Sequence, residues 1–308
     1  MRRLRAIGLI LTAVVSAVSL SSCVMLRAGS LVQDVFLGEE DIGLAGESLP
    51  ALIKASEVLT AADPADQGAA ITTASLYLLY GSEYLEGSAF YLQASEYERR
   101  TELVRRARNL YKRAFVLLRP FVEKKSPNLL SMEIAIGEAV SSDASGALAR
   151  ELRPFRRGDA PLLYYSAASI LAAFSSDPLD FGTAALVPAA LAMIEKALDL
   201  DPGYGNGSIY ELAFQIYVGM PAELGGGMAK AEAALAEAER LSGGTCVSAY
   251  VSYALNLCAP AGDLEGYERY LAKALGVMPE QHAHKRLLIV LAQRKARFLL
   301  ENAEDFVF

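Results

Sequence analysis

The stretch ALAMIEKALDLDP, from Ala190 to Pro202, decides the fold because its small, large and helix-stopping residues follow a helical spacing. Ala190, Ile194 and Ala197 are separated by four and then three residues, so they share one face of a helix. The alanines allow a second helix to approach closely, the isoleucine fills the layer between them, and Pro202 stops the helix. This register is typical of the second helix of a tetratricopeptide repeat.

The same register occurs in three further stretches of the chain. They are Ala107-x3-Tyr111-x2-Ala114, with Pro120 one residue late, Ala231-x3-Leu235-x2-Ala238-x4-Gly243 and Tyr267-x3-Leu271-x2-Ala274-x4-Pro279. The first helix of each pair is expected to place large residues around a small one, and Tyr77-x2-Tyr80-Gly81-x2-Tyr84 fits this pattern well. Stretches at Tyr164, Ile209 and Tyr250 fit it loosely. An irregular helical bundle with chance spacing is the alternative interpretation.

Outside these stretches, Ala- and Leu-rich segments with apolar spacing of three and four dominate, and alternating patterns typical of strands are nearly absent. We therefore predict an all-α fold of degenerate tetratricopeptide-like helical hairpin repeats, an α-α superhelix with about four repeat pairs and extra helices. Helices are expected at about 46–62, 68–94, 97–119, 127–141, 144–151, 161–174, 183–200, 207–219, 226–241, 247–258, 263–276 and 280–303.

The N-terminus has the composition of an export signal. Arg2, Arg3 and Arg5 precede the apolar stretch 6–20, which is shorter than the roughly 20 residues of a spanning helix. It ends in Leu-Ser-Ser-Cys at Cys23, which resembles the lipobox of bacterial lipoproteins. The alternatives are a secretory signal with an incidental cysteine and a transmembrane helix.

The lipobox interpretation divides the chain into three parts. Residues 1–22 are a signal peptide, 23–44 are a tether whose acyl chains, such as palmitate, are carried by Cys23, and 45–308 are a single helical-repeat domain. Several acyl chains on one cysteine anchor a protein firmly. We expect a periplasmic protein held to a membrane by lipid, and the absence of Asp after Cys23 favours the outer membrane.

The amino-acid composition excludes several classes of protein and of site. The 308 residues are 53% hydrophobic, which excludes a disordered chain, and the net charge of −7 is unsuited to general nucleic-acid binding. Two histidines, two residues apart on different helix faces, leave no metal site, and no cofactor is expected. Cys246 and Cys258 are expected to be free thiols, because a helix between them would span ~18 Å and a disulfide needs Cα atoms within ~7 Å.

Four short motifs close together in the second half of the chain resemble a known protein family. They are DPGY from Asp201, IYELAF from Ile209, YVGMP from Tyr217 and LGG from Leu224. The Tyr77–Tyr84 helix and the late segment Leu287–Leu300 support the resemblance. Together these stretches resemble the TRAP transporter T-component family (TatT).

The resemblance implies a lipoprotein of a tripartite ATP-independent periplasmic transport system. Such a protein works beside a soluble substrate-binding P-component and an ion-coupled membrane permease, as a homo-oligomer for which a trimer is the best expectation. It implies no catalytic residues, and the chain is not expected to be an enzyme. The alternative from another class is an envelope scaffold or assembly lipoprotein that uses similar repeats to bind proteins.

Two candidate sites follow from the repeat register. The first is a concave groove for an apolar or amphipathic ligand or for a peptide segment of a partner. Its candidate residues are Tyr165, Tyr210, Phe214, Tyr217 and Leu255. Such a stripe is also typical of a core.

The second candidate site is the basic stretch 99–119, which could dock an acidic partner or an anionic lipid surface. Its candidate residues are Arg105, Arg106, Lys112 and Arg113. The alternative is a solvated helix face that pairs with Glu98 and Glu102.

Overall fold

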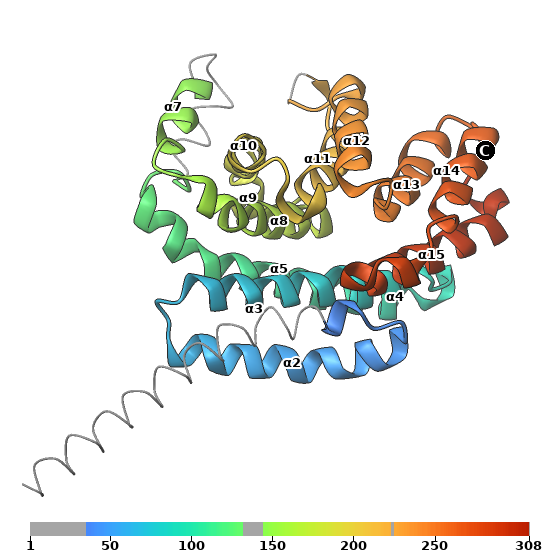
Figure 1. Cartoon of the computed structure of the whole chain (residues 1–308), viewed down its shortest axis with the longest axis horizontal. Helices are drawn as coiled ribbons and strands as arrows, with labels where there is room; N and C mark the ends of the chain where they lie inside the picture. The colour runs from blue at the N-terminus through green and yellow to red at the C-terminus, as the bar shows by residue number, and fades with distance from the viewer. Residues whose placement is uncertain (1–34, 132–143, 223–224, 308) are drawn as a thin grey trace, which may run out of the picture.

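The computed structural model describes residues 35–131, 144–222 and 225–307. Every regular element in these ranges is a helix, which confirms the predicted all-α class (Figure 1). The α-helices are α2 (Ile42–Ala62), α3 (Gln67–Leu79), α4 (Gly87–Phe90), α5 (Tyr97–Lys125), α7 (Ala144–Glu151), α8 (Ala160–Ser176), α9 (Phe181–Ala184), α10 (Val187–Leu200), α11 (Ser208–Gly219), α12 (Met228–Ser242), α13 (Val247–Tyr253), α14 (Leu264–Leu275) and α15 (Arg286–Glu301).

The helices are arranged in an arc whose end returns to its beginning (Figure 1). Helices α2, α3 and α5 lie side by side, α8 packs on α5, and α10 packs on α8. The chain then runs through α11 to α14 and returns with α15, which contacts α2. An ion pair of 3.1 Å between Arg286 at the start of α15 and Glu40 before α2 joins the two ends.

The residues of the predicted register are core residues. The register positions below 2% exposure are Ala107, Tyr111, Ala114, Ala190, Ile194, Ala197, Ala231, Ala238, Tyr267, Leu271 and Ala274. The packing role of these positions is therefore confirmed, whereas their arrangement as a superhelix of repeats stays a prediction.

Aspartate side chains define where several helices begin. Asp41, Asp66 and Asp180 precede α2, α3 and α9, and each accepts hydrogen bonds from two backbone N–H groups of the first turn. A carboxylate at this position satisfies donors that have no partner within the helix and also interacts favourably with the helix dipole.

Two π-helical segments interrupt the regular pattern. η1 (Tyr80–Glu86) follows α3 directly, and η6 (Ala254–Cys258) follows α13. The wider turn changes the face on which the following side chains lie, and such segments occur frequently at functional sites. In this chain η1 carries Glu83 and Glu86, two half-buried carboxylates.

Three expected helix boundaries were wrong. Helix α5 continues through Pro120 to Lys125, because Pro120 is exposed while Leu118 and Val122 on the opposite face are buried, and this burial outweighs one lost hydrogen bond. The expected helix 183–200 is two helices, since α10 begins at Val187 with a proline in its first turn. The last long helix begins only at Arg286. Most of the expected helix 127–141 lies outside the described residues.

The segment Phe181–Leu200 is long and apolar enough to cross a membrane by length and composition alone. It comprises two helices, and α10 places Ala190, Met193 and Ala197 in the core against α8. The buried face of α10 therefore belongs to the core of the helical domain.

Candidate functional site

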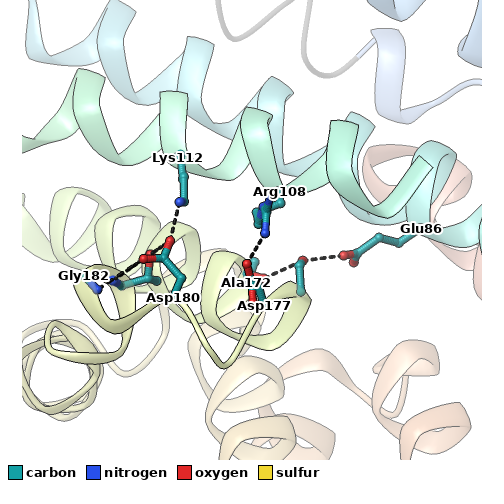
Figure 2. A network of polar contacts seen from close by, with 9 residues as sticks. Glu86, Arg108, Lys112, Ala172, Asp177, Asp180 and Gly182 are labelled. Atoms are coloured by element: carbon teal, nitrogen blue, oxygen red, sulfur yellow. Dashed lines mark hydrogen bonds and ion pairs between the residues drawn. The ribbon is translucent and has the colours of Figure 1, made fainter. Parts of the chain in front are cut away.

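Helix α5 directs part of its basic face into the protein. Lys112 pairs with Asp180, the residue that caps α9 (Figure 2). The hydrogen bond from Lys112 lowers the pKa of Asp180 to about 2. On the other side, Arg113 Nη2 lies 2.6 Å from Glu57 Oε1 and 2.8 Å from the Tyr77 hydroxyl. These two basic residues therefore join helices, and much of their charge is neutralised within the chain.

The other two basic candidates lie on the outer face of α5. Arg105 donates through Nε and Nη2 to Glu102, at 2.9 and 2.8 Å, one turn earlier on the same helix. Arg106 is exposed and forms no ion pair within the part of the chain that the structure describes. The solvated-face interpretation therefore applies to Arg105, and a docking role for this face stays a prediction that depends most on Arg106.

Glu86 connects three elements at the centre of the polar network. Its Oε2 accepts from the Tyr111 hydroxyl on α5 at 2.9 Å. Its Oε1 accepts from Ser176 Oγ at the end of α8 at 2.7 Å (Figure 2). The neighbouring Arg108 pairs with Asp177 beyond α8. The result is a set of charged hydrogen bonds that holds η1, α5 and α8 together.

The groove residues on α11 occupy different environments. Phe214 is fully buried and stacks on Tyr253 with 6.1 Å between ring centroids, so its expected exposure on a concave surface is wrong. Helical spacing placed it correctly on one face with Tyr210, but that face packs against α13. Tyr217 is 9% exposed, with Lys230 Nζ 5.3 Å from its ring centroid. Tyr210 is half-buried and keeps part of its ring accessible.

The remaining groove candidates, Tyr165 on α8 and Leu255 on η6, are also half-buried. Burial raises the pKa of Tyr165 well above its ordinary value, and its nearest aromatic neighbour is Tyr164, at 4.8 Å between ring centroids. Whether the accessible parts of Tyr165, Tyr210 and Leu255 bind a ligand or a partner stays a prediction.

A carboxylate near Tyr164 was not anticipated from the sequence. Glu211 on α11 is half-buried, and burial raises its pKa from 4.5 to about 7, although the charge of Lys285 opposes this shift. Burial also lowers the pKa of Lys285. Glu211 and Lys285 are far apart in the sequence, so only the fold brings them together.

Two cavities lie at the seam where α15 meets α4 and the start of α5. The larger, of about 770 Å³, is lined by residues that include Glu86, Phe90, Arg100, Ser176, Phe298 and Phe306. The smaller, of about 370 Å³, is lined by Tyr91, Arg294, Arg297, Phe298 and Glu301. Tyr91 and Phe298 border both cavities. This seam is the second feature that the sequence did not predict.

Cys246 and Cys258 are buried free cysteines, as expected, at the two ends of the continuous helical segment formed by α13 and η6. Cys23 lies outside the described residues. Within the described ranges, no group of three or more His, Cys, Asp or Glu side chains is placed to hold a metal ion.

Comparison with known proteins identifies a family. The sequence model of the TRAP transporter T-component family matches residues 38–307 of this chain. A protein of Treponema pallidum (strain Nichols), described as uncharacterized, is 32% identical over 272 residues, which cover 88% of this chain and 82% of that protein.

Proposed function

Since the chain belongs to the TRAP transporter T-component family, we propose that it is the lipid-anchored periplasmic component of a tripartite transport system and binds the solute-binding P-component. The observation that carries this proposal is the family match, which extends over residues 38–307 and therefore includes nearly every described helix. The P-component in turn serves an ion-coupled permease in the membrane.

Anchoring through acylated Cys23 suits this role. An acyl anchor on Cys23 keeps the helical domain at a membrane surface. A soluble P-component would then meet the domain at a membrane surface and carry solute onward to the permease. We propose the outer membrane as the site of the anchor and a homo-oligomer, best expected to be a trimer, as the assembly.

The surface proposed for the P-component is the accessible part of the groove. Tyr210, Tyr165 and Leu255 are half-buried, so each combines a fixed position with accessible apolar area. Rigid aromatic residues of this kind carry much of the binding energy in protein interfaces. The same surface suits a small apolar or amphipathic ligand handed over by the partner.

The test is calorimetric titration of a soluble body, residues 24–308, with the solute-binding protein encoded beside it. We expect saturable binding, and we expect Tyr210→Ser to weaken it by at least about tenfold, as for the loss of an aromatic anchor. Tyr97→Ser is the matched control, because Tyr97 is 70% exposed on α5.

Absence of binding to the wild-type body would contradict the proposed function. Equal weakening of binding by both tyrosine variants would rule out the groove as the binding surface, while the P-component would remain the partner. Neighbouring genes for barrel assembly or cell-wall synthesis, in place of P-component and permease genes, would favour the envelope scaffold.

A further inference from the structure

The seam between α15 and the N-terminal helices has the size of a small-molecule site. Its two cavities, of about 770 and 370 Å³, share Tyr91 and Phe298 as walls. Pockets that bind small organic ligands have volumes of about 300–1,000 Å³. The seam forms only where the end of the chain returns to its beginning, so both ends of the domain contribute to it (Figure 1).

The wall of the larger cavity is aromatic. Phe90 lies 5.7 Å from Phe298 and 6.0 Å from Phe306, measured between ring centroids. Phe298 also lies 5.0 Å from Tyr91, with the two rings nearly perpendicular. Such a cluster offers flat apolar surface to the body of a ligand and loses little conformational entropy when it binds.

Positive charge lies beside this wall. Arg100 borders the larger cavity, and its Nη2 donates to the backbone carbonyl of Leu92. Its Nε is buried and has no hydrogen-bond partner in the described part of the chain. A buried N–H without a partner is costly, and an acceptor on a ligand would remove that cost.

The smaller cavity adds two exposed guanidinium groups. Arg294 lies over the ring of Tyr91 at 4.9 Å, and Arg297 borders the same cavity. Acidic residues are also present: Glu301 and Asp305 lie at the rim. The carboxylate of Glu86 borders the larger cavity as well, and its two oxygens accept from the hydroxyls of Tyr111 and Ser176.

We propose that this seam binds an amphipathic organic anion. Its apolar body lies on the wall formed by Phe90, Phe298 and Phe306, and its acidic head lies beside the guanidinium group of Arg100. Arg294 and Arg297 raise the positive potential at the adjoining cavity and attract the head group. This inference rests on the seam alone and does not depend on a P-component.

The experiment uses the soluble body, residues 24–308, and the fluorescent aromatic anion 8-anilinonaphthalene-1-sulfonate. The chain contains no tryptophan, so emission from the bound dye is followed against tyrosine only. We expect saturable binding of one dye per chain, and the uncharged N-phenyl-1-naphthylamine should bind at least about tenfold more weakly, because it lacks the group that pairs with arginine. Displacement by dodecanoate would indicate a lipid-derived acid, and displacement by 2-naphthoate a compact aromatic acid.

Two variants with the same change of charge locate the head group. Arg100→Gln should weaken dye binding at least about tenfold, whereas Arg99→Gln should leave it unchanged, because Arg99 is exposed and pairs with Glu96 on the surface. Phe298→Leu tests the wall independently if Arg100→Gln fails to fold, and it should also weaken binding. Phe181→Ser controls for dye on exposed apolar surface, since Phe181 is 84% exposed.

Three results would overturn the proposal. They are binding that does not saturate, binding that neither acid displaces, and equal loss in the Arg99 and Arg100 variants. None of them bears on the P-component, so a failure of this site is distinguishable from a failure of the proposed function.

Discussion

Gly81 lies directly beneath the ring of Tyr111. A Cβ atom placed on Gly81 would lie 2.4 Å from Cε1 and 2.9 Å from Cζ of that ring. Tyr111 is fully buried, and its hydroxyl donates to Glu86 at 2.9 Å, so the ring is held on both sides. The glycine therefore allows η1 and α5 to pack at this distance, and this contact also positions the carboxylate of the polar network.

Substitution of Gly81 by alanine should destabilise the protein by about 1–3 kcal/mol, the usual cost of overpacking a filled core. The ring of Tyr111 cannot move aside without weakening its hydrogen bond to Glu86. Urea unfolding followed by circular dichroism measures the change. Gly146→Ala is the control, because nothing lies within 4 Å of its Cβ position on α7, and it should be neutral or stabilising. Equal effects of the two substitutions would refute the packing role of Gly81.

Truncation of Phe214 should separate packing from recognition on α11. Phe214→Ala removes a fully buried ring and should cost about 3–5 kcal/mol, whereas Tyr210→Ala should cost much less because Tyr210 is half-buried. Thermal melts of the two variants measure the difference. A Phe214 variant as stable as the wild type would show that the ring is available to a ligand.

The stability of the protein should depend on pH through Glu211. Its pKa is raised by burial from 4.5 to about 7, so between these values the folded chain binds more protons than the unfolded chain. The free energy of unfolding therefore falls as the pH rises through this window. Glu211→Gln cannot ionise, so its stability relative to the wild type should increase from about pH 4.5 to about pH 7 and then level off.

Urea unfolding at several pH values measures this difference. Glu237→Gln is the control, because Glu237 is exposed on α12 and its hydrogen bond with Arg240 lowers its pKa. Its effect should have the opposite sign. A constant difference between Glu211→Gln and the wild type would mean that Glu211 titrates normally.

Lipid attachment should depend on Cys23 alone. In cells fed labelled palmitate, Cys23→Ala should abolish labelling and leave a soluble or unprocessed protein, because the thiol is the acceptor of the first acyl group. Cys246→Ala should remain labelled, since Cys246 is buried within the folded domain. Label on the Cys23 variant would contradict the lipobox interpretation.

The two thiols of the helical body should react only after unfolding. Burial raises the pKa of Cys246 and that of Cys258, which lowers the fraction of reactive thiolate. A thiol reagent should therefore titrate two groups in denaturant and react slowly with the native body, residues 24–308. Cys258→Ala should reduce the count in denaturant to one. A native body that reacts as fast as the denatured one would contradict this burial.

The positions that pack against other helices were predictable, because helix packing requires a residue pattern that is visible within a single helix. Ala190 and Ala197 share a face by spacing alone, and a small residue on an otherwise apolar face indicates contact with another helix. The same local rule could not separate Tyr210 from Phe214. Both lie on the predicted face, and only the position of the neighbouring helix decides which ring is covered.

The candidate sites could be predicted less well. The basic composition of α5 was evident, but not that Lys112 and Arg113 pair with Asp180 and Glu57 on other helices. The seam cavities were not predicted at all. Phe90 and Phe298 lie more than two hundred residues apart, and no local pattern in either segment points to the other.

The sequence by itself determined the helical class, the packing register and the family. Each of these depends on residue spacings of three and four or on short motifs within one segment of the chain. Only the tertiary structure decided which charges are neutralised, which carboxylate has a raised pKa and where the arc closes into a seam. The physical reason is that burial, pairing and cavity shape depend on residues from distant segments meeting at one place, as Glu211 meets the charge of Lys285 and Phe298 meets Phe90. Helical spacing predicts which face of each segment packs, whereas the fold decides which other segments contact that face.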